Sequence, residues 1–555
     1  MSQPMPDVEP SRADVSAPTA PPTEPPLAPA AAAFWGVLGV TALVYAPTLW
    51  NGLVWDDHAL LTGDPRVTGP LSLSALFQPY WSGLVEPASG VVAYARPLVT
   101  LSFALQHALT GLLPWPLHGV NVLLHLLNGV LLERWLRPKL GAQGAALAVA
   151  FWLLHPTAVE AVAWISGRTD LLALHLGLLA LLAWERARAG AGWTYDLFAG
   201  VALVGAGASK EVAFLFWPLL ALSLIPTSAA ARWRGASLLL LSGGLSLWAR
   251  VESLRAVAVE PPALTVLEPL WLPLVRAVVS AGQLMSLWVW PFNPSALVAT
   301  KTLPPPTSPL VWGGMLSLCL VGGGLLRSLW RLWRLRADLR GGHLLVLMEA
   351  QGWLMLSLGW LPVLNLVPLS APSPVAERFW YVPSVGMVLL FCWALRSLDV
   401  RSLEVRSLEV RSSWFSLPGA GERVRRWGLG ALSLWLLVSA AVVVIRGREW
   451  ESDHALWRAE LARHGVRHIL GARNMGLALE QAGDLVGALQ VWAEGWNLGL
   501  GRGTVYRGEV AELLLEGLMQ QGQRETARAL LSAAQGEASQ SEGEVWRRLQ
   551  RRVAP

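Results

Sequence analysis

Long apolar runs recur along nearly the whole chain, and this recurrence limits its possible folds more than any other feature. An α-helix needs about 20 consecutive apolar residues to cross a bilayer, and many runs approach that length. The 555 residues are 54% hydrophobic and only 15% charged. We therefore predict an all-α fold, a polytopic membrane helix bundle.

About eleven segments are apolar enough to be predicted as membrane spans, and several end at Arg, Pro or Gly. These predicted spans cover residues 32–50, 115–136, 142–154, 170–185, 193–208, 211–226, 235–250, 309–326, 343–361, 380–396 and 427–446. Two further apolar segments, 97–113 and 272–292, are predicted to be re-entrant or surface helices. If they crossed the membrane, the arginine-rich connections would no longer all lie on one side.

The basic residues follow the positive-inside rule and do not form a nucleic-acid-binding pattern. The formal net charge is +5, and arginines cluster in short connections between apolar runs, as they do on the cytoplasmic side of membrane proteins. With a cytoplasmic N-terminus, five such stretches share that side: residues 134–139, 186–188, 232–234, 327–340 and 422–427. The connections that carry the remaining polar groups then face outward.

The sequence divides into a tail, a membrane domain and a C-terminal domain. Residues 1–30, rich in Pro and Ala, are predicted to be a disordered cytoplasmic tail. The transmembrane domain covers 31–446, with a first external loop at about 51–114. A cytoplasmic loop at 396–426 contains a tandem RSLEV repeat, to which we assign no function.

Residues 447–555 are less apolar and are predicted to form an extracytoplasmic helical domain. Small residues at Gly476, Gly483 and Ala488 occur where two antiparallel helices must approach closely, and Gly522 and Ala527 repeat that pattern. The segment resembles about two tetratricopeptide (TPR) repeats of irregular spacing. So few repeats are expected to pack on the membrane domain or on a partner.

No metal site or disulfide is predicted. Cys319 and Cys392 both lie inside apolar runs, as packed thiols do. His118, Asn121 and His125 share one face of a helix, but this segment offers no further ligand nearby. We therefore expect these three side chains to form hydrogen bonds between helices.

Two adjacent carboxylates, Asp56 and Asp57, follow the first apolar run directly in the stretch WDDHALLTGDP. One interpretation makes them a helix N-cap and a solvated neighbour. The other makes one of them a general base for an acceptor hydroxyl, or a ligand for a divalent cation, beside a carboxylate that tunes it.

Four basic side chains, Arg96, Arg168, Lys210 and Arg378, occur in outer connections. Each has a structural alternative, such as a snorkelling anchor for Arg96 or an ion pair with Glu211 for Lys210. Ionisable groups near a membrane are costly, however, and generally functional. They are predicted to bind a phosphate near the Asp pair, in a pocket also lined by His155, Glu160, Asp170, Glu211 and Glu377. A carboxylate pair facing a basic cluster suits chemistry on an anionic lipid.

Six motifs in order, WDDHALLTGDPRV, YARPLVTLSFALQHALTG, LHGVNVLLHLLNGVLL, HPTAVEAVAWISGRTDLLA, ASKEVAFLFWPLLAL and AERFWYVPSVG, resemble the transmembrane and TPR-containing O-mannosyltransferase-like family. This family is related to the protein O-mannosyltransferases within the GT-C superfamily of membrane glycosyltransferases. The resemblance covers about residues 34–400 and extends through the repeats to the C-terminus.

The resemblance implies an inverting glycosyltransferase that moves a sugar from a polyprenyl-phosphate donor to a hydroxyl, expected on protein Ser or Thr, outside the cytoplasm. Asp56 would be the general base and Asp57 its neighbour. Arg96, Arg168, Lys210 and Arg378 would line the donor phosphate site. The expected location is a bacterial inner membrane, with the TPR-like domain engaging an acceptor protein or glycan.

Two other functions remain open at this stage. A lipid or solute transporter would place charges at several depths and often has repeated halves, whereas here the charges gather at one face. A non-catalytic scaffold would recruit partners through the TPR-like domain alone. The sugar, the lipid length and the need for a divalent cation are not determined by the sequence.

Overall fold

The computed structural model describes residues 27–78, 96–225, 227–255, 269, 271–292, 304–335, 343–366, 375–408, 420–466, 469–498 and 505–535. Over these residues the chain forms helices and no strand, which confirms the predicted all-α fold. The predicted disordered tail lies outside them, except for its last four residues, which begin α1.

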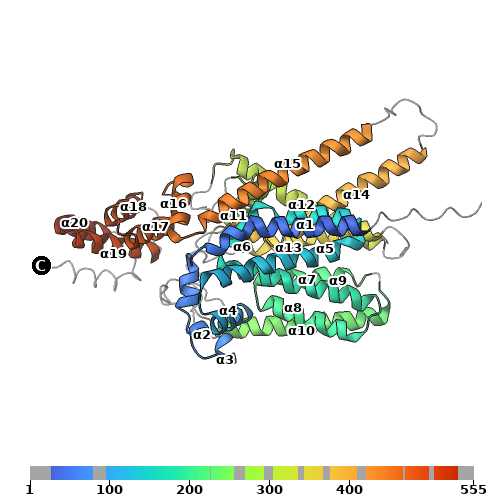
Figure 1. Ribbon diagram of the computed structural model, residues 1–555, viewed down its shortest axis with the longest axis horizontal. Coiled ribbons are helices and arrows are strands. Elements are labelled where there is room, and N and C mark those ends of the chain that lie inside the picture. Colours follow the sequence, from blue (N-terminus) through green and yellow to red (C-terminus); the bar gives the residue numbers. More distant parts are fainter. Residues whose placement is uncertain are drawn as a thin grey trace, which may run out of the picture.

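The bundle (Figure 1) is built from long helices joined by short one-turn helices and loops. Its helices are α1 (Leu27–Tyr45), α4 (Pro97–Thr110), α5 (Pro114–Leu153), α6 (Val159–Ala163), α7 (Arg168–Arg188), α8 (Trp193–Gly207), α9 (Phe216–Leu222), α10 (Ala229–Arg255), α11 (Trp271–Val289), α12 (Pro309–Leu335), α13 (His343–Trp360), α14 (Ser384–Leu408) and α15 (Ala420–Glu449). The tightest packing joins α7 to α8, α11 to α12, and α13 to α14.

The helix α5 contains both of the spans predicted at 115–136 and 142–154. Gly141 has a φ of 72° and interrupts the helix three residues after Pro138, which cannot donate a backbone hydrogen bond. The second half folds back on the first, because His125 Nε2 lies 3.0 Å from the Leu153 carbonyl oxygen. The two spans are therefore the arms of a hairpin.

Seven helices among the described residues are long and apolar enough to cross a membrane, fewer than the eleven predicted spans. They lie at Ala31–Trp50, Pro114–Leu153, Ile165–Arg188, Trp271–Val289, Pro309–Leu335, Leu344–Val363 and Gly430–Glu449. The predicted spans 193–208, 211–226, 235–250 and 380–396 form helices that are too short or too polar to meet this criterion. The chain is nonetheless a multi-pass membrane protein.

The segments expected to be re-entrant differ from one another in length. Residues 97–113 form α4, whose 14 residues are too few to cross a bilayer. Residues 272–292 form α11, which has 19 residues and an apolar composition sufficient for a span. The length of α11 is therefore compatible with a membrane span. That it is re-entrant or lies at the surface stays a prediction.

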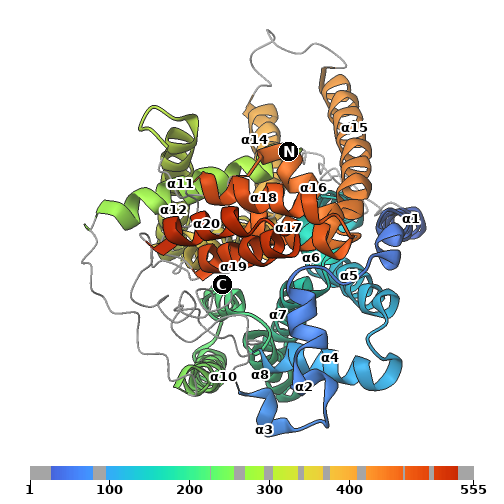
Figure 2. The same ribbon diagram turned by 90° about the vertical axis from the view of Figure 1, so that its left-hand side faces the viewer.

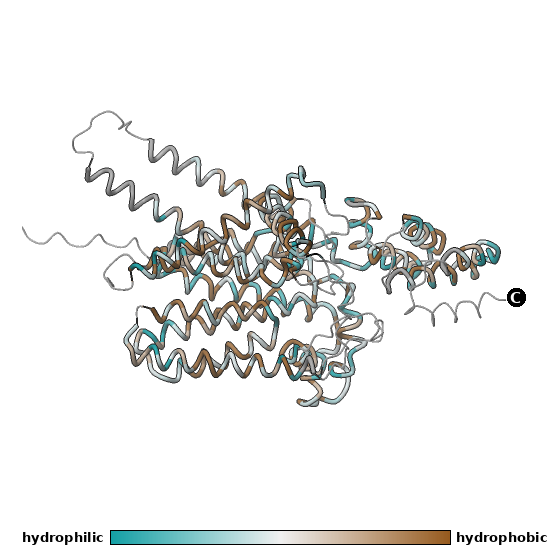
Figure 3. The backbone as a smooth tube through the Cα atoms, turned by 180° about the vertical axis from the view of Figure 1, so that it is seen from behind, coloured by the Kyte–Doolittle hydropathy of each residue, from teal (hydrophilic) through white to brown (hydrophobic). Residues whose placement is uncertain are grey.

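Five helices follow the bundle: α16 (Asp453–His464), α17 (Ile469–Gln481), α18 (Leu485–Asn497), α19 (Val505–Gln520) and α20 (Arg524–Gln535). They form a C-terminal helical domain across one end of the bundle (Figures 1 and 2). Figure 3 shows that these helices are less uniformly hydrophobic than the bundle. At the opposite end, α14 and α15 project as a hairpin, and α14 runs through the first copies of the RSLEV repeat to Leu408.

Candidate active site

The loop that carries the two aspartates follows α1 and a short 3-10 helix (η1, Ala46–Trp50), and lies at the same end of the bundle as the C-terminal domain. Trp55 has a φ of 59°, a left-handed conformation that is rare for a bulky residue. Its ring stacks on Trp164 and meets Trp457 edge-on, each with centroids 5.3 Å apart. The strain, about 1–3 kcal/mol, is typical of functional sites and is held by this packing.

Asp57 is fully buried and holds the loop to the membrane domain. Its Oδ2 accepts a hydrogen bond from the Val54 backbone N–H at 3.1 Å. Its Oδ1 accepts from the Ser166 backbone N–H at 2.9 Å and from the Ser166 hydroxyl at 2.5 Å. Burial raises the pKa of Asp57 to about 7, although these hydrogen bonds lower it. Because protein donors occupy both oxygens of Asp57, its role is to fix the loop.

Asp56 has a different environment, because no described residue donates a hydrogen bond to its carboxylate. It is half-buried, and its nearest influences are the positive charges of Arg378 and Arg96. Burial raises the pKa of Asp56 to about 6, and the two arginines limit that rise. The carboxylate thus keeps an oxygen available to a substrate and titrates close to neutral pH.

Arg378 lies on the short helix η8 (Glu377–Trp380) and is held by Glu160 of α6. One Glu160 oxygen accepts from the Arg378 backbone N–H at 2.9 Å, and the other pairs with Nη1 of its guanidinium. The guanidinium carbon lies 5.1 Å from the Trp164 ring centre and 5.9 Å from that of Trp55. Glu160 is fully buried, so it positions Arg378 and does not itself reach solvent.

Arg96 belongs to a second basic group, centred on Glu211. Arg96 Nη2 lies 3.2 Å from one Glu211 oxygen, and Arg250 Nη2 of α10 lies 2.7 Å from the other. Arg250 lies within a predicted span and far from any motif, so no feature of the sequence pointed to it. Lys210 pairs with Asp170 at 2.5 Å, and not with its neighbour Glu211 as the structural alternative proposed.

Arg168 does not fit its predicted role as a phosphate ligand. It is fully buried, and it donates to Asn121 at 2.9 Å, to Gln106 at 2.8 Å and to the Leu117 carbonyl at 2.8 Å. Its guanidinium also lies 4.4 Å from the centre of the Phe103 ring. Because a protein network occupies this side chain, its role is to join α4, α5 and α7.

His155 and Glu377 are each held by other groups of the protein. His155 is buried, bonds Thr157 at 2.8 Å, and stacks on Trp288 with centroids 5.3 Å apart. Glu377 is buried 3.6 Å from Arg446 at the end of α15. Neither has a described contact with Asp56, and their place in the pocket lining stays a prediction.

The polar face of α5 forms hydrogen bonds between helices, as expected. Asn121 donates to the Trp164 carbonyl at 3.0 Å, and His125 lies 2.9 Å from the Tyr381 hydroxyl. Across the described residues, no group of three or more His, Cys, Asp or Glu side chains is arranged to hold a metal ion.

Several known proteins are similar to part of this chain. The chain is 36% identical over 152 residues to the mouse protein O-mannosyl-transferase TMTC1, 37% over 153 residues to the human one, and 36% over 157 residues to that of Drosophila melanogaster. The predicted resemblance is confirmed. The matches cover 27% of this chain and only 16–18% of the relatives' length. No family model matches the chain, and no solved structure matches it.

Proposed function

We propose that this chain is a membrane glycosyltransferase that moves a sugar from a polyprenyl-phosphate donor to a protein Ser or Thr hydroxyl, with inversion, outside the cytoplasm. The names of the relatives favour mannose as the sugar and a protein as the acceptor. The observation that carries the proposal is Asp56, which combines an available carboxylate, a pKa of about 6 and the electrostatic influence of two arginines, Arg378 and Arg96.

The proposed chemistry is a single displacement at the anomeric carbon. Asp56 accepts the proton of the acceptor hydroxyl while the hydroxyl oxygen forms a bond to that carbon. The bond from the anomeric carbon to the phosphate oxygen breaks, and its electron pair leaves with the lipid phosphate. That phosphate needs positive charge more than a proton. Arg96 and Arg378 supply this charge, and Arg250 and Lys210 add to it.

The test measures donor turnover by purified protein in lipid with a panel of polyprenyl-phosphate sugars, with polyprenyl-phosphate mannose as the first member. Wild type should turn over at least one donor in the presence of an acceptor peptide rich in Ser and Thr. Asp56→Asn should lose at least about 100-fold in kcat, since it keeps the shape of the side chain but cannot take up a proton.

Arg168→Lys is the matched control for the basic groups. Arg168 is part of a buried hydrogen-bond network, so this variant should be less stable than wild type. Its folded fraction should keep the wild-type KM for the donor, because Arg168 is already occupied by protein groups. Arg378→Lys should instead raise the KM for the donor. If wild type and Asp56→Asn are equally inert across the panel while both bind an external protein through the C-terminal domain, the protein is a scaffold and the proposal fails.

A further inference from the structure

The loop that carries Asp56 is held from two sides, and only one of them is the membrane domain. From the bundle, Ser166 donates to Asp57 of the loop, and Trp164 Nε1 donates to the Val54 carbonyl at 3.2 Å. The other side is the start of the C-terminal domain, nearly 400 residues further along the sequence.

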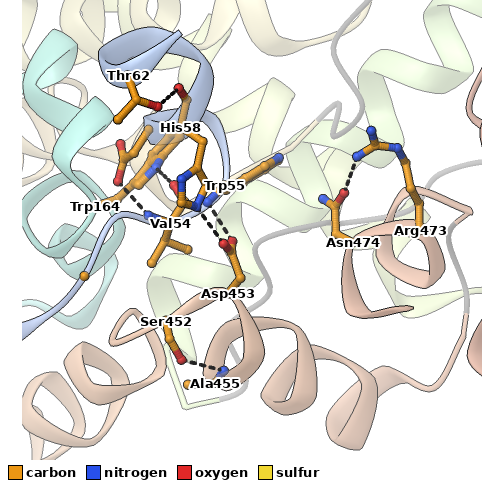
Figure 4. Close-up of polar contacts among 12 residues, drawn as sticks. Val54, Trp55, His58, Thr62, Trp164, Ser452, Asp453, Ala455, Arg473 and Asn474 are labelled. Carbon is orange, nitrogen blue, oxygen red and sulfur yellow. Dashed lines mark hydrogen bonds and ion pairs between the residues drawn. The ribbon is translucent and has the colours of Figure 1, made fainter. Parts of the chain in front are cut away.

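Asp453 of α16 makes the central contacts on that side (Figure 4). Its Oδ1 accepts a hydrogen bond from the Trp55 backbone N–H at 2.8 Å. Its Oδ2 lies 2.8 Å from His58 Nε2. One carboxylate therefore binds the residues on both sides of the aspartate pair, and it holds the strained Trp55 peptide directly. The hydrogen bond to Asp453 also raises the pKa of His58.

Other contacts extend the same junction. The Gly52 backbone N–H donates to the Glu451 carbonyl at 2.9 Å, and the Asn51 side chain donates to the Gly447 carbonyl at 3.0 Å. Trp457 packs on the Trp55 ring. Because these contacts occupy the entry to the loop, its conformation depends on where the end of α15 and the start of α16 lie.

We propose that Asp453 is a positioning residue that fixes the loop carrying Asp56, so that the C-terminal helical domain completes the catalytic site as well as offering a surface to partners. This inference rests on the proposed transferase function. The geometry supports it, since Asp56 is the one aspartate of the pair without hydrogen bonds from described residues, and Asp453 contacts the residues on either side of the pair.

The variant that tests this is Asp453→Ala in the full-length protein. Displacing a reacting group by about 1 Å can cost on the order of 100-fold in rate, so kcat should fall about 10- to 100-fold. The KM for the donor should stay near that of wild type, because the arginines that face the phosphate are not attached to Asp453. Asp453→Asn keeps an oxygen for the Trp55 N–H and should restore most of kcat.

Asp484→Ala is the matched control. Asp484 caps α18 by accepting from the Gly487 N–H at 2.8 Å, in the same domain but without a described contact to the loop. Removing it should leave kcat at the wild-type value. If Asp453→Ala and Asp484→Ala have the same kcat, the positioning role is wrong while the transferase function stands.

Hydrogen exchange of the peptide covering 51–62 gives a readout that does not need activity. Its amides should exchange faster in Asp453→Ala than in wild type and Asp484→Ala; unchanged exchange would overturn the inference. An inert wild type would instead refute the proposed function. If Asp453→Ala does not fold, His58→Ala removes half of the same contact, and its kcat then decides.

Discussion

Asp56 and Asp57 are neighbours in the sequence, but the structure gives them different tasks. Asp57 accepts three hydrogen bonds and fastens the loop, whereas Asp56 accepts none from the described residues and is influenced by the charges of two arginines. A general base needs a free lone pair directed at a substrate, and a structural carboxylate must have its lone pairs occupied. The division of roles therefore follows from hydrogen bonding, and the motif alone does not reveal it.

The pKa of Asp56 predicts how activity depends on pH. Burial raises this pKa from 3.8 to about 6, and only the deprotonated form can accept a proton. Donor turnover should therefore be low at pH 5, rise through about pH 6 and level off above it. A profile of kcat against pH checks this in wild type. An acid limb centred near 3.8, the ordinary value, would contradict the assignment of Asp56 as the base.

At the scale of elements, the helices α11 and α12 cross with almost no side chain between them. A Cβ built on Gly314 would lie 1.9 Å from the Val278 carbonyl oxygen, and one on Gly282 would lie 2.1 Å from the Leu310 carbonyl oxygen. Small residues allow membrane helices to approach closely. The crossing places the end of α11 beside η8, where Trp380 donates to the Leu284 carbonyl at 2.6 Å.

This crossing predicts opposite effects for two adjacent glycines of α12. Gly314→Ala forces the helices apart and should destabilise the protein by about 1–3 kcal/mol. Gly313→Ala enters open space and should be neutral or slightly stabilising, because Ala favours helices by about 1 kcal/mol over Gly. Thermal unfolding of both purified variants checks this. Equal midpoints would show that the crossing is less tight than described.

At the scale of the whole molecule, the bundle and the C-terminal domain meet over a buried charge cluster near the candidate site. Arg446, at the end of α15, lies 3.6 Å from Glu377 of η8 and also pairs with Glu449. Neither carboxylate oxygen of Glu377 accepts a hydrogen bond from the described residues, and burial raises its pKa to about 8. Arg463 of α16 also pairs with Glu449, so two guanidinium groups, one from the bundle and one from the C-terminal domain, compensate these two carboxylates.

The two partners of this pair should respond unequally to mutation. Arg446→Met leaves Glu377 buried without its ion-pair partner and should cost about 3–5 kcal/mol of unfolding free energy. Glu377→Gln leaves Arg446 paired with Glu449 and should cost clearly less. Denaturant unfolding of each variant in the same lipid measures the difference. If Glu377→Gln is the more damaging change, Glu377 has a role beyond pairing with Arg446.

The sequence alone was sufficient for the all-α membrane fold, since apolar run length and arginine placement depend only on the cost of moving polar groups into lipid. It also indicated Asp56, Arg96, Lys210 and Arg378, because charges beside membrane spans are costly and conspicuous. Seven described helices meet the length and apolar composition of a span, against about eleven predicted, because several of the predicted segments form helices that are too short or too polar.

Only the tertiary structure decided which charges remain available and which are already satisfied. Arg168 and Arg378 are equally basic in the sequence, yet Arg168 is enclosed by Asn121, Gln106 and Leu117. Asp453 has no local signal at all, because its partners lie nearly 400 residues away. Burial and hydrogen bonding are properties of neighbours, and neighbours distant in the chain are brought together only by folding.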